Sequence, residues 1–201
     1  MGYVDDIIIE LDQIAVSEIM KYGVPSLDDY NDTINTALEL GKILNANLEV
    51  IKLGARLMEI KLGQAIAEKK KIESVNMCLG FAMNFLTGFP VSEDFKTKVL
   101  ACIKEQNETA FSCIEAEICT NALCCNSLTP RKLLKKFYNF HSAGYNFEET
   151  FLFTEEKAEE KWKKLSLDIC KKNMEANYNK IKDFLSAAKK DPSKFFEETN
   201  N

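Results

Sequence analysis

Histidine and cysteine are the residues of this chain best suited to ligate a metal ion or to act as nucleophiles. The sequence holds one histidine, His141, and seven cysteines. His141 follows the aromatic run 137–140, and the sequence assigns it no cysteine or carboxylate partner, so a Cys-His nucleophile has no support. We therefore expect His141 to be a surface side chain or one stacked on a neighbouring ring.

The seven cysteines predict buried, reduced thiols. Their number is odd, no C-x-x-C pair occurs, and most lie in apolar helical context, where a thiol acts as a small hydrophobic group. The adjacent pair Cys124 and Cys125 is poorly placed to serve one tetrahedral zinc ion. The N-terminal stretch has acids where a signal peptide needs bases, and no apolar run is long enough for a membrane span. We expect a cytoplasmic protein.

Composition narrows the class of partner. The chain has 201 residues, a formal net charge of −5 and a pI near 5.2, which suit one globular domain. An acidic balance argues against nucleic acid and anionic membranes as partners, since both require a basic face. Neither a partner nor the oligomeric state can be named from the sequence.

The stretch 47–63 predicts a central helix. Ile51, Ala55, Met58 and Leu62 follow each other at steps of four, three and four, which places them on one apolar line. We expect Met58 to be a core residue. Glu59 lies on a second, charged line with Arg56, where a solvated or arginine-paired carboxylate is expected rather than an acid–base group. A helix this apolar is covered by neighbours on most sides.

The rest of the chain predicts an all-α, single-domain bundle of about eight helices. Ser26, Asn47, Ser92 and Thr129 are in positions to cap helices that begin after them. Residues 145–153 have aromatic, β-like character and predict an ordered loop or a short hairpin, followed by a short helix capped at Thr154. We expect one domain over residues 1–190 and a mobile acidic tail over 191–201.

Asn121 is the most informative polar residue of the apolar pattern. It shares a helical line with Ile118 and Cys125, so its side chain should point inward. A buried asparagine needs hydrogen-bond partners. It either ties two helices together or lines a residual pocket.

Several of these stretches resemble the HD-domain superfamily of metal-dependent phosphohydrolases. LEVIKLGARLMEIKLG is similar to the family helix EVxxLAALLHDIG, and IEAEICTNALCCNSLTP is similar to the helix E-A-x-I-x-x-D-A-D-x-L. TALELGKILNAN and SVNMCLGFAMNFLTGFPVSEDFKTKVLACIKEQNE resemble the helices around them. The resemblance covers roughly residues 26–140 and rests on the scaffold, because the motif residues themselves are absent.

The resemblance implies where the family's metal ligands would fall. The first family histidine corresponds to Asp29, with Asp32 as the other option. The His-Asp dyad corresponds to Met58 and Glu59, and the distal aspartate to Asn121. The supplementary histidines of two-metal members correspond to Ser74, Gln106 and Asn107.

These replacements imply a degenerate member of the family. A hydrolytic metal ion needs imidazole or carboxylate donors, whereas Met58 offers a thioether and Asn121 a neutral carbonyl. No cofactor is expected, although weak binding of Mg²⁺ or Mn²⁺ by the remaining carboxylates stays open. The favoured hypothesis is a pseudoenzyme acting as a protein-interaction module or as a binder of a small phosphorylated ligand. The alternatives are a phosphohydrolase with an altered carboxylate site and a structural helical protein unrelated to the family.

Overall fold

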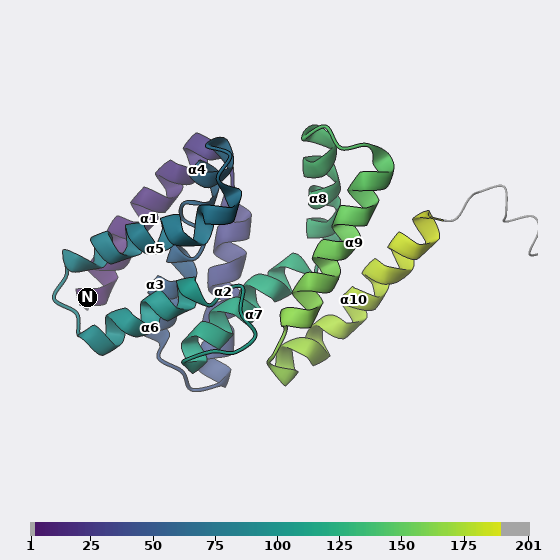
Figure 1. Cartoon of the computed structure of the whole chain (residues 1–201). Helices are drawn as coiled ribbons and strands as arrows, with labels where there is room; N and C mark the ends of the chain where they lie inside the picture. The colour runs from purple at the N-terminus through teal and green to yellow at the C-terminus, as the bar shows by residue number, and fades with distance from the viewer. Residues whose placement is uncertain (1–2, 190–201) are drawn as a thin grey trace, which may run out of the picture. The chain divides into compact units, whose positions relative to one another are not determined.

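The computed structural model describes residues 3–189, and all of its regular elements are helical (Figure 1). They comprise ten α-helices and one 3₁₀ helix, which confirms the predicted all-α class. The chain divides into two compact units, residues 1–126 and 127–201. The expectation of one domain over residues 1–190 stays a prediction, and the expected tail at 191–201 lies outside the described residues.

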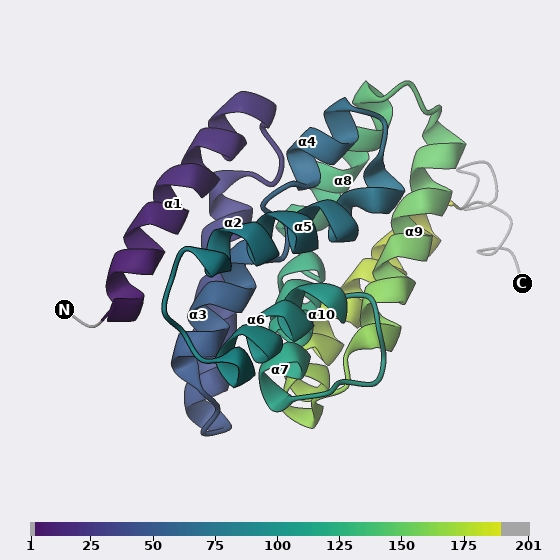
Figure 2. The ribbon, with the colours of Figure 1, turned by 60° about the vertical axis from the view of Figure 1, so that its left-hand side comes forward.

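The first unit is a bundle with α3 inside it. Helix α3 packs on α2 and α6, and α1 also contacts it (Figure 2). The α3 side chains Val50, Ile51, Leu53 and Leu57 are inaccessible to solvent. The helices of this unit are α1 (Tyr3–Tyr22), α2 (Leu27–Ile43), α3 (Leu48–Leu57), α4 (Leu62–Ala67), the 3₁₀ helix η1 (Lys71–Glu73), α5 (Ser74–Thr87), α6 (Glu93–Lys104) and α7 (Ile114–Ser127), whose last residue begins the second unit.

The predicted caps start the helices where expected. The Ser26 hydroxyl accepts a hydrogen bond from the backbone N–H of Asp29, and Asn47 accepts from Glu49 and Val50. Ser92 caps α6 in the same way. Each cap satisfies amide groups that have no partner inside their own helix.

The central helix is shorter than predicted. The expected helix over 47–63 is wrong beyond Leu57, because a turn separates α3 from α4. In that turn the N–H of Ile60 bonds to the carbonyl of Leu57, and the N–H of Leu62 bonds to the carbonyl of Glu59. The Met58 carbonyl, which the Leu62 amide would bond in a continuous helix, instead accepts a side-chain donor from Gln106.

Gly54 permits the close packing of α3 against its neighbours. A Cβ atom at this position would lie 2.7 Å from both Cβ and Sγ of Cys102 on α6, and 3.5 Å from Sγ of Cys119 on α7. The absence of a side chain at Gly54 therefore lets α3 approach α6 more closely than a larger residue would allow, whereas the distance to α7 is an ordinary van der Waals contact.

The second unit contains α8 (Pro130–Ser142), α9 (Phe147–Lys164) and α10 (Asp168–Ala188), each of which contacts the other two. Thr129 caps α8 and is followed by proline at the first helical position, as predicted. The expectation of a loop or hairpin over 145–153 is wrong from Phe147 onward. Asn146 and Glu149 form a reciprocal capping box that starts α9 there. Thr154 is a buried residue inside α9 and not a cap.

Two further expectations concern exposure. All seven cysteines are free thiols, and six of them are buried, whereas Cys113 is half-buried. Among the helices of residues 3–189, none combines the length and the apolar character that a membrane span needs.

Candidate functional site

Met58 and Gln106 meet where the first unit would carry the family dyad. Met58 caps the C-terminal end of α3 and is 1% exposed, which confirms it as a core residue. Gln106 follows α6 and is also buried. Its side-chain nitrogen Nε2 donates to the carbonyl of Met58 at 3.1 Å and to the carbonyl of Ile103 at 3.0 Å. The polar group beside Met58 is thus engaged in joining the ends of α3 and α6.

Asn121 is fully buried in α7, as its place in the apolar pattern predicted. Its amide nitrogen Nδ2 donates to the backbone carbonyl of Glu117, one turn earlier in the same helix, at 2.9 Å. After this bond the side chain still has one N–H donor and its carbonyl oxygen, and only the oxygen could ligate a cation. That oxygen is neutral and is a poorer donor to a divalent cation than the carboxylate of an aspartate.

The aspartates proposed for the first ligand position lie on α2. Asp29 is half-buried in the first turn, whereas Asp32 is exposed. The backbone carbonyl of Asp29 accepts from Thr33 Oγ1 at 2.9 Å and from Asn126 Nδ2 at 3.1 Å. The same Asn126 amide lies 3.0 Å from Thr33 Oγ1, so α7 is joined to the start of α2 through backbone and hydroxyl groups.

The remaining predicted positions differ in exposure. Glu59 lies in the turn after α3 and is half-buried, and Ser74 is half-buried at the start of α5. Asn107 is exposed. Within the predicted set, Gln106 and Met58 are in direct contact through their hydrogen bond.

The expectation of a solvated or arginine-paired Glu59 stays a prediction, and Arg56 itself forms an ion pair with an acid of another helix. Arg56 Nε and Nη2 bind the two carboxylate oxygens of Asp12 on α1 at 2.8 and 3.2 Å. The hydroxyl of Tyr30 donates to Asp12 Oδ1 at 2.9 Å. Burial, followed by the neighbouring Asp12 charge, raises the pKa of Tyr30 well above its ordinary value. Helical spacing could not reveal this trio, because its members come from three different helices.

Glu115 is another buried acid that the sequence left unassigned. It is 6% exposed, and its Oε1 accepts the backbone N–H of Asn47 at 3.0 Å. The bond fixes the start of α7 against the start of α3. Helical spacing could have indicated its burial, because Glu115 lies in the first turn of α7 on the line that continues through Cys119 and Ala122 at steps of four and three.

The residues at the predicted ligand positions do not fit the metal site that the resemblance implies. A thioether at 58, an amide at 121 and an amide at 106 replace nitrogen and carboxylate donors, and two of the three side chains already bond to backbone carbonyls. Within residues 3–189, no three His, Cys, Asp or Glu side chains are grouped so that they could hold a metal ion. His141 lies in the other unit, on α8.

The architecture is that of the HD-superfamily hydrolases. The chain aligns with a predicted HD-superfamily hydrolase from an uncultured Thermotogales bacterium at a TM-score of 0.64 and 13% identity, covering 89% of this chain and 88% of that one. An HD-superfamily hydrolase from Bacillus thuringiensis aligns at 0.64 and 15% identity, covering 98% and 96%. These similarities show the fold.

One of the structurally similar proteins was solved in complex with a nucleotide. YpgQ of Bacillus subtilis, solved in complex with ADP, aligns at a TM-score of 0.67 and 15% identity, covering 93% of this chain and 95% of YpgQ. No protein-family model matches the sequence, and no curated protein matches it either. Likeness to known proteins is therefore carried by the fold and not by the sequence.

Proposed function

We propose that this protein is a binding module of HD fold that does not hydrolyse phosphate esters through an HD-type metal centre. The observation that carries the proposal is Met58, which occupies the dyad position with a buried thioether and a carbonyl already bonded by Gln106. A thioether binds neither Mg²⁺ nor Mn²⁺ well, and the buried methionine fills the volume that a ligand sphere would need.

The ligand we infer is a small phosphorylated molecule, with a protein partner as the second possibility. The inference is supported by the shared fold with YpgQ, whose structure was solved with ADP. ADP is accordingly the first probe. We also infer a cytoplasmic location, since seven free thiols suit a reducing compartment.

The hydrolysis half of the proposal is tested with purified protein and ADP, ATP or p-nitrophenyl phosphate in the presence of Mn²⁺, Mg²⁺ or Co²⁺. We expect turnover at the protein-free rate with each metal, and no difference between the wild type and the Glu59→Gln variant. Metal-dependent turnover that falls in Glu59→Gln or in Asp29→Asn would instead establish the alternative, a hydrolase using the remaining carboxylates.

The binding half is tested by thermal unfolding with increasing ADP, in the absence of added metal. A ligand that binds only the folded state raises the melting temperature by mass action, so a saturable rise supports the nucleotide ligand. Adenosine and inorganic phosphate serve as matched controls, because they test the nucleoside part and the phosphate part of ADP separately. If none of the three compounds raises the melting temperature, the nucleotide ligand is ruled out and binding of a protein partner is the remaining proposal.

A further inference from the structure

Helix α8 presents one continuous apolar face. At 100° per residue, Pro130, Leu134, Tyr138 and His141 fall within one sector of the helix, with Leu133 and Phe137 at its edge. The lysines of α8 fall on the opposite side, at positions 132, 135 and 136. Leu134 is 62% exposed and Tyr138 is 72% exposed, so the face is open to solvent.

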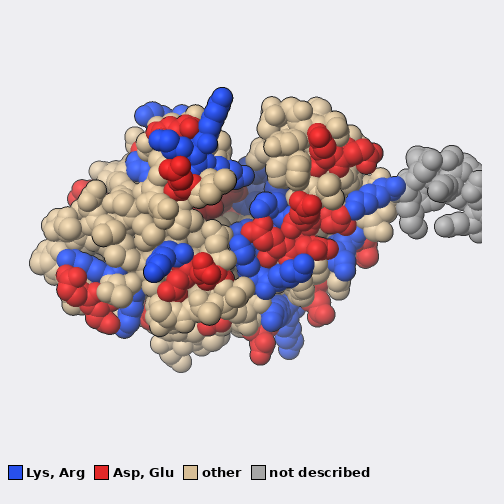
Figure 3. All heavy atoms as spheres, in the orientation of Figure 1, with Lys and Arg blue, Asp and Glu red and all other residues tan. Residues whose placement is uncertain are grey.

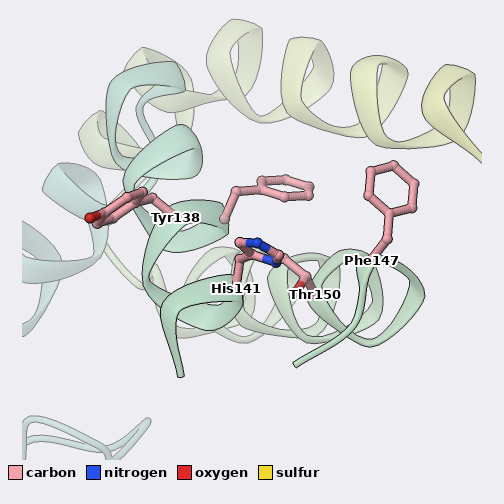
Figure 4. Close-up of a pocket in the computed structure, with 5 residues that line it drawn as sticks. Tyr138, His141, Phe147 and Thr150 are labelled. Carbon is pink, nitrogen blue, oxygen red and sulfur yellow. The ribbon is translucent and has the colours of Figure 1, made fainter. Parts of the chain in front are cut away.

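A pocket of about 330 Å³ opens on this face between α8 and α9 (Figure 4). His141 lies between Tyr138 on one side and Phe147 on the other, with Thr150 beside it. The hydroxyl oxygen of Thr150 is buried without a hydrogen-bond partner. Phe137 completes the lining and stacks edge-on against Phe151, with ring centroids 4.5 Å apart. The pocket is therefore lined mainly by aromatic rings, and Phe137 in its wall is packed against Phe151.

A second pocket of about 210 Å³ opens further toward the start of α8, between α8 and α10. Leu133 and Leu134 line it from α8, and Ile181 and Phe184 line it from α10. Phe184 is 49% exposed. The two pockets thus follow one another along the same face, one near residues 130–134 and the other near residues 137–141.

The two ends of the face carry opposite charges. Lys180 lines the pocket near the start of α8. Glu148 is exposed in the first turn of α9, directly after Phe147 of the other pocket. The end of the unit where α8 meets α9 is otherwise largely free of charge, with acidic side chains at its flank (Figure 3).

We propose that the α8 face binds a second copy of this chain, with the two α8 helices antiparallel. A two-fold interface presents the same patch twice, so it needs projecting groups and hollows on one surface. On this face Tyr138 and Phe147 are the projecting groups. The pocket lined by Leu133 and Phe184 is the hollow that would receive the projecting groups of the other copy. An antiparallel arrangement also brings Lys180 of one copy to the Glu148 end of the other, twice per dimer.

The dimensions of the face suit such an interface. Helix α8 has 13 residues, which span roughly 20 Å at the helical rise, and the exposed rings of α9 and α10 widen the strip beside it. A stable interface buries about 800 Å² on each partner, so this interface needs the exposed side chains of α9 and α10 as well as those of α8. Exposed aromatic side chains gathered around two hollows are typical of protein–protein contact.

The first experiment is sedimentation velocity of the full chain over a range of concentrations. We expect a monomer–dimer equilibrium that Leu134→Lys weakens by about tenfold or more, since a charge would enter an apolar contact. Ile72→Lys is the matched control, because Ile72 is 99% exposed in η1 of the first unit, and it should leave the equilibrium unchanged. A wild-type chain that stays monomeric at roughly 100 μM, or a dimer indifferent to Leu134→Lys, overturns the proposal.

The second experiment tests the antiparallel arrangement by exchanging charges. Lys180→Glu and Glu148→Lys each place like charges together at both ends, and each should weaken self-association by about fivefold at low salt. A 1:1 mixture of the two variants should associate as well as the wild type, because the mixed dimer restores two opposite-charge pairs. A mixture no better than either variant alone overturns the arrangement.

Discussion

The side-chain amide of Gln106 donates one hydrogen bond to the carbonyl of Met58 and one to the carbonyl of Ile103. Met58 and Ile103 are both buried, so water cannot replace this donor at either carbonyl. The bond ends α3 where the sequence pattern would have continued it, and it ties that end to α6. The position that the resemblance predicted for the family's metal dyad is a structural junction between α3 and α6.

Removing the donor should destabilise the protein. Gln106→Leu leaves two buried carbonyls without this donor, and we expect the free energy of unfolding to fall by about 2–3 kcal/mol. Urea denaturation followed by circular dichroism measures the change. Glu108→Ala, at an exposed position two residues later, is the control and should shift stability by less than about 0.5 kcal/mol. If the two variants lost the same unfolding free energy, the Gln106 hydrogen bonds would not be what stabilises the contact between α3 and α6.

Two glycines allow a matched test of helix packing. Gly54→Ala would place a Cβ atom 2.7 Å from Cys102, so we expect a loss of about 1–3 kcal/mol from overpacking. Gly80→Ala lies in α5 with nothing within 4 Å of the new Cβ, and should gain about 0.5–1 kcal/mol from helix propensity. The two variants should therefore shift the melting temperature in opposite directions. A stabilised Gly54→Ala protein would show that α6 is free to move away.

The sequence predicted helix starts better than helix ends. Ser26, Asn47, Ser92 and Thr129 each precede a helix because a side-chain oxygen can bond to the free amides of the first turn, a purely local interaction. Beyond the end of α3, the carbonyl of Met58 is bonded instead by Gln106, which is 48 residues away from Met58 in the chain. Local periodicity contains no trace of such a partner.

The segment 145–153 shows how residue type can mislead. Its aromatic rings predicted extended structure, yet Phe153 lies in α9 and packs against Phe140, and Tyr145, in the connection before α9, packs against both rings. The decisive residues were Asn146 and Glu149, which have the spacing of a capping box. In the candidate site, the inward positions of Met58 and Asn121 followed from periodicity, whereas their hydrogen-bond partners did not.

The trio of Tyr30, Asp12 and Arg56 should make stability fall at alkaline pH. Burial and the Asp12 charge raise the pKa of Tyr30 in the folded state, whereas the unfolded phenol ionises near pH 10. Above about pH 10 the unfolded state loses this proton and the folded state keeps it, so the free energy of unfolding decreases by up to about 1.4 kcal/mol per pH unit. Tyr30→Phe removes this contribution.

The measurement is the difference in unfolding free energy between wild type and Tyr30→Phe from pH 7 to pH 11. At pH 7 the wild type should be more stable by about 1 kcal/mol, because the variant takes a donor away from Asp12. The difference should shrink above about pH 10. Curves that stay parallel over the whole range would show that the phenol ionises equally in both states.

Cys113 should be the one thiol that reacts in the folded protein. It is half-buried before α7, while the other six cysteines are buried. Burial raises the pKa of the Cys78 thiol to about 11 and also raises the pKa of the Cys113 thiol, so thiolate is scarce at both sites and access decides the order of reaction. Titration with a disulfide reagent at mildly alkaline pH should therefore show a single fast thiol per chain, and all seven after denaturation. Cys113→Ser should abolish the fast phase, and the control Cys78→Ser should leave it intact. A fast phase that survives Cys113→Ser would contradict the prediction, because a helix that carries a buried thiol would then open readily enough to expose it.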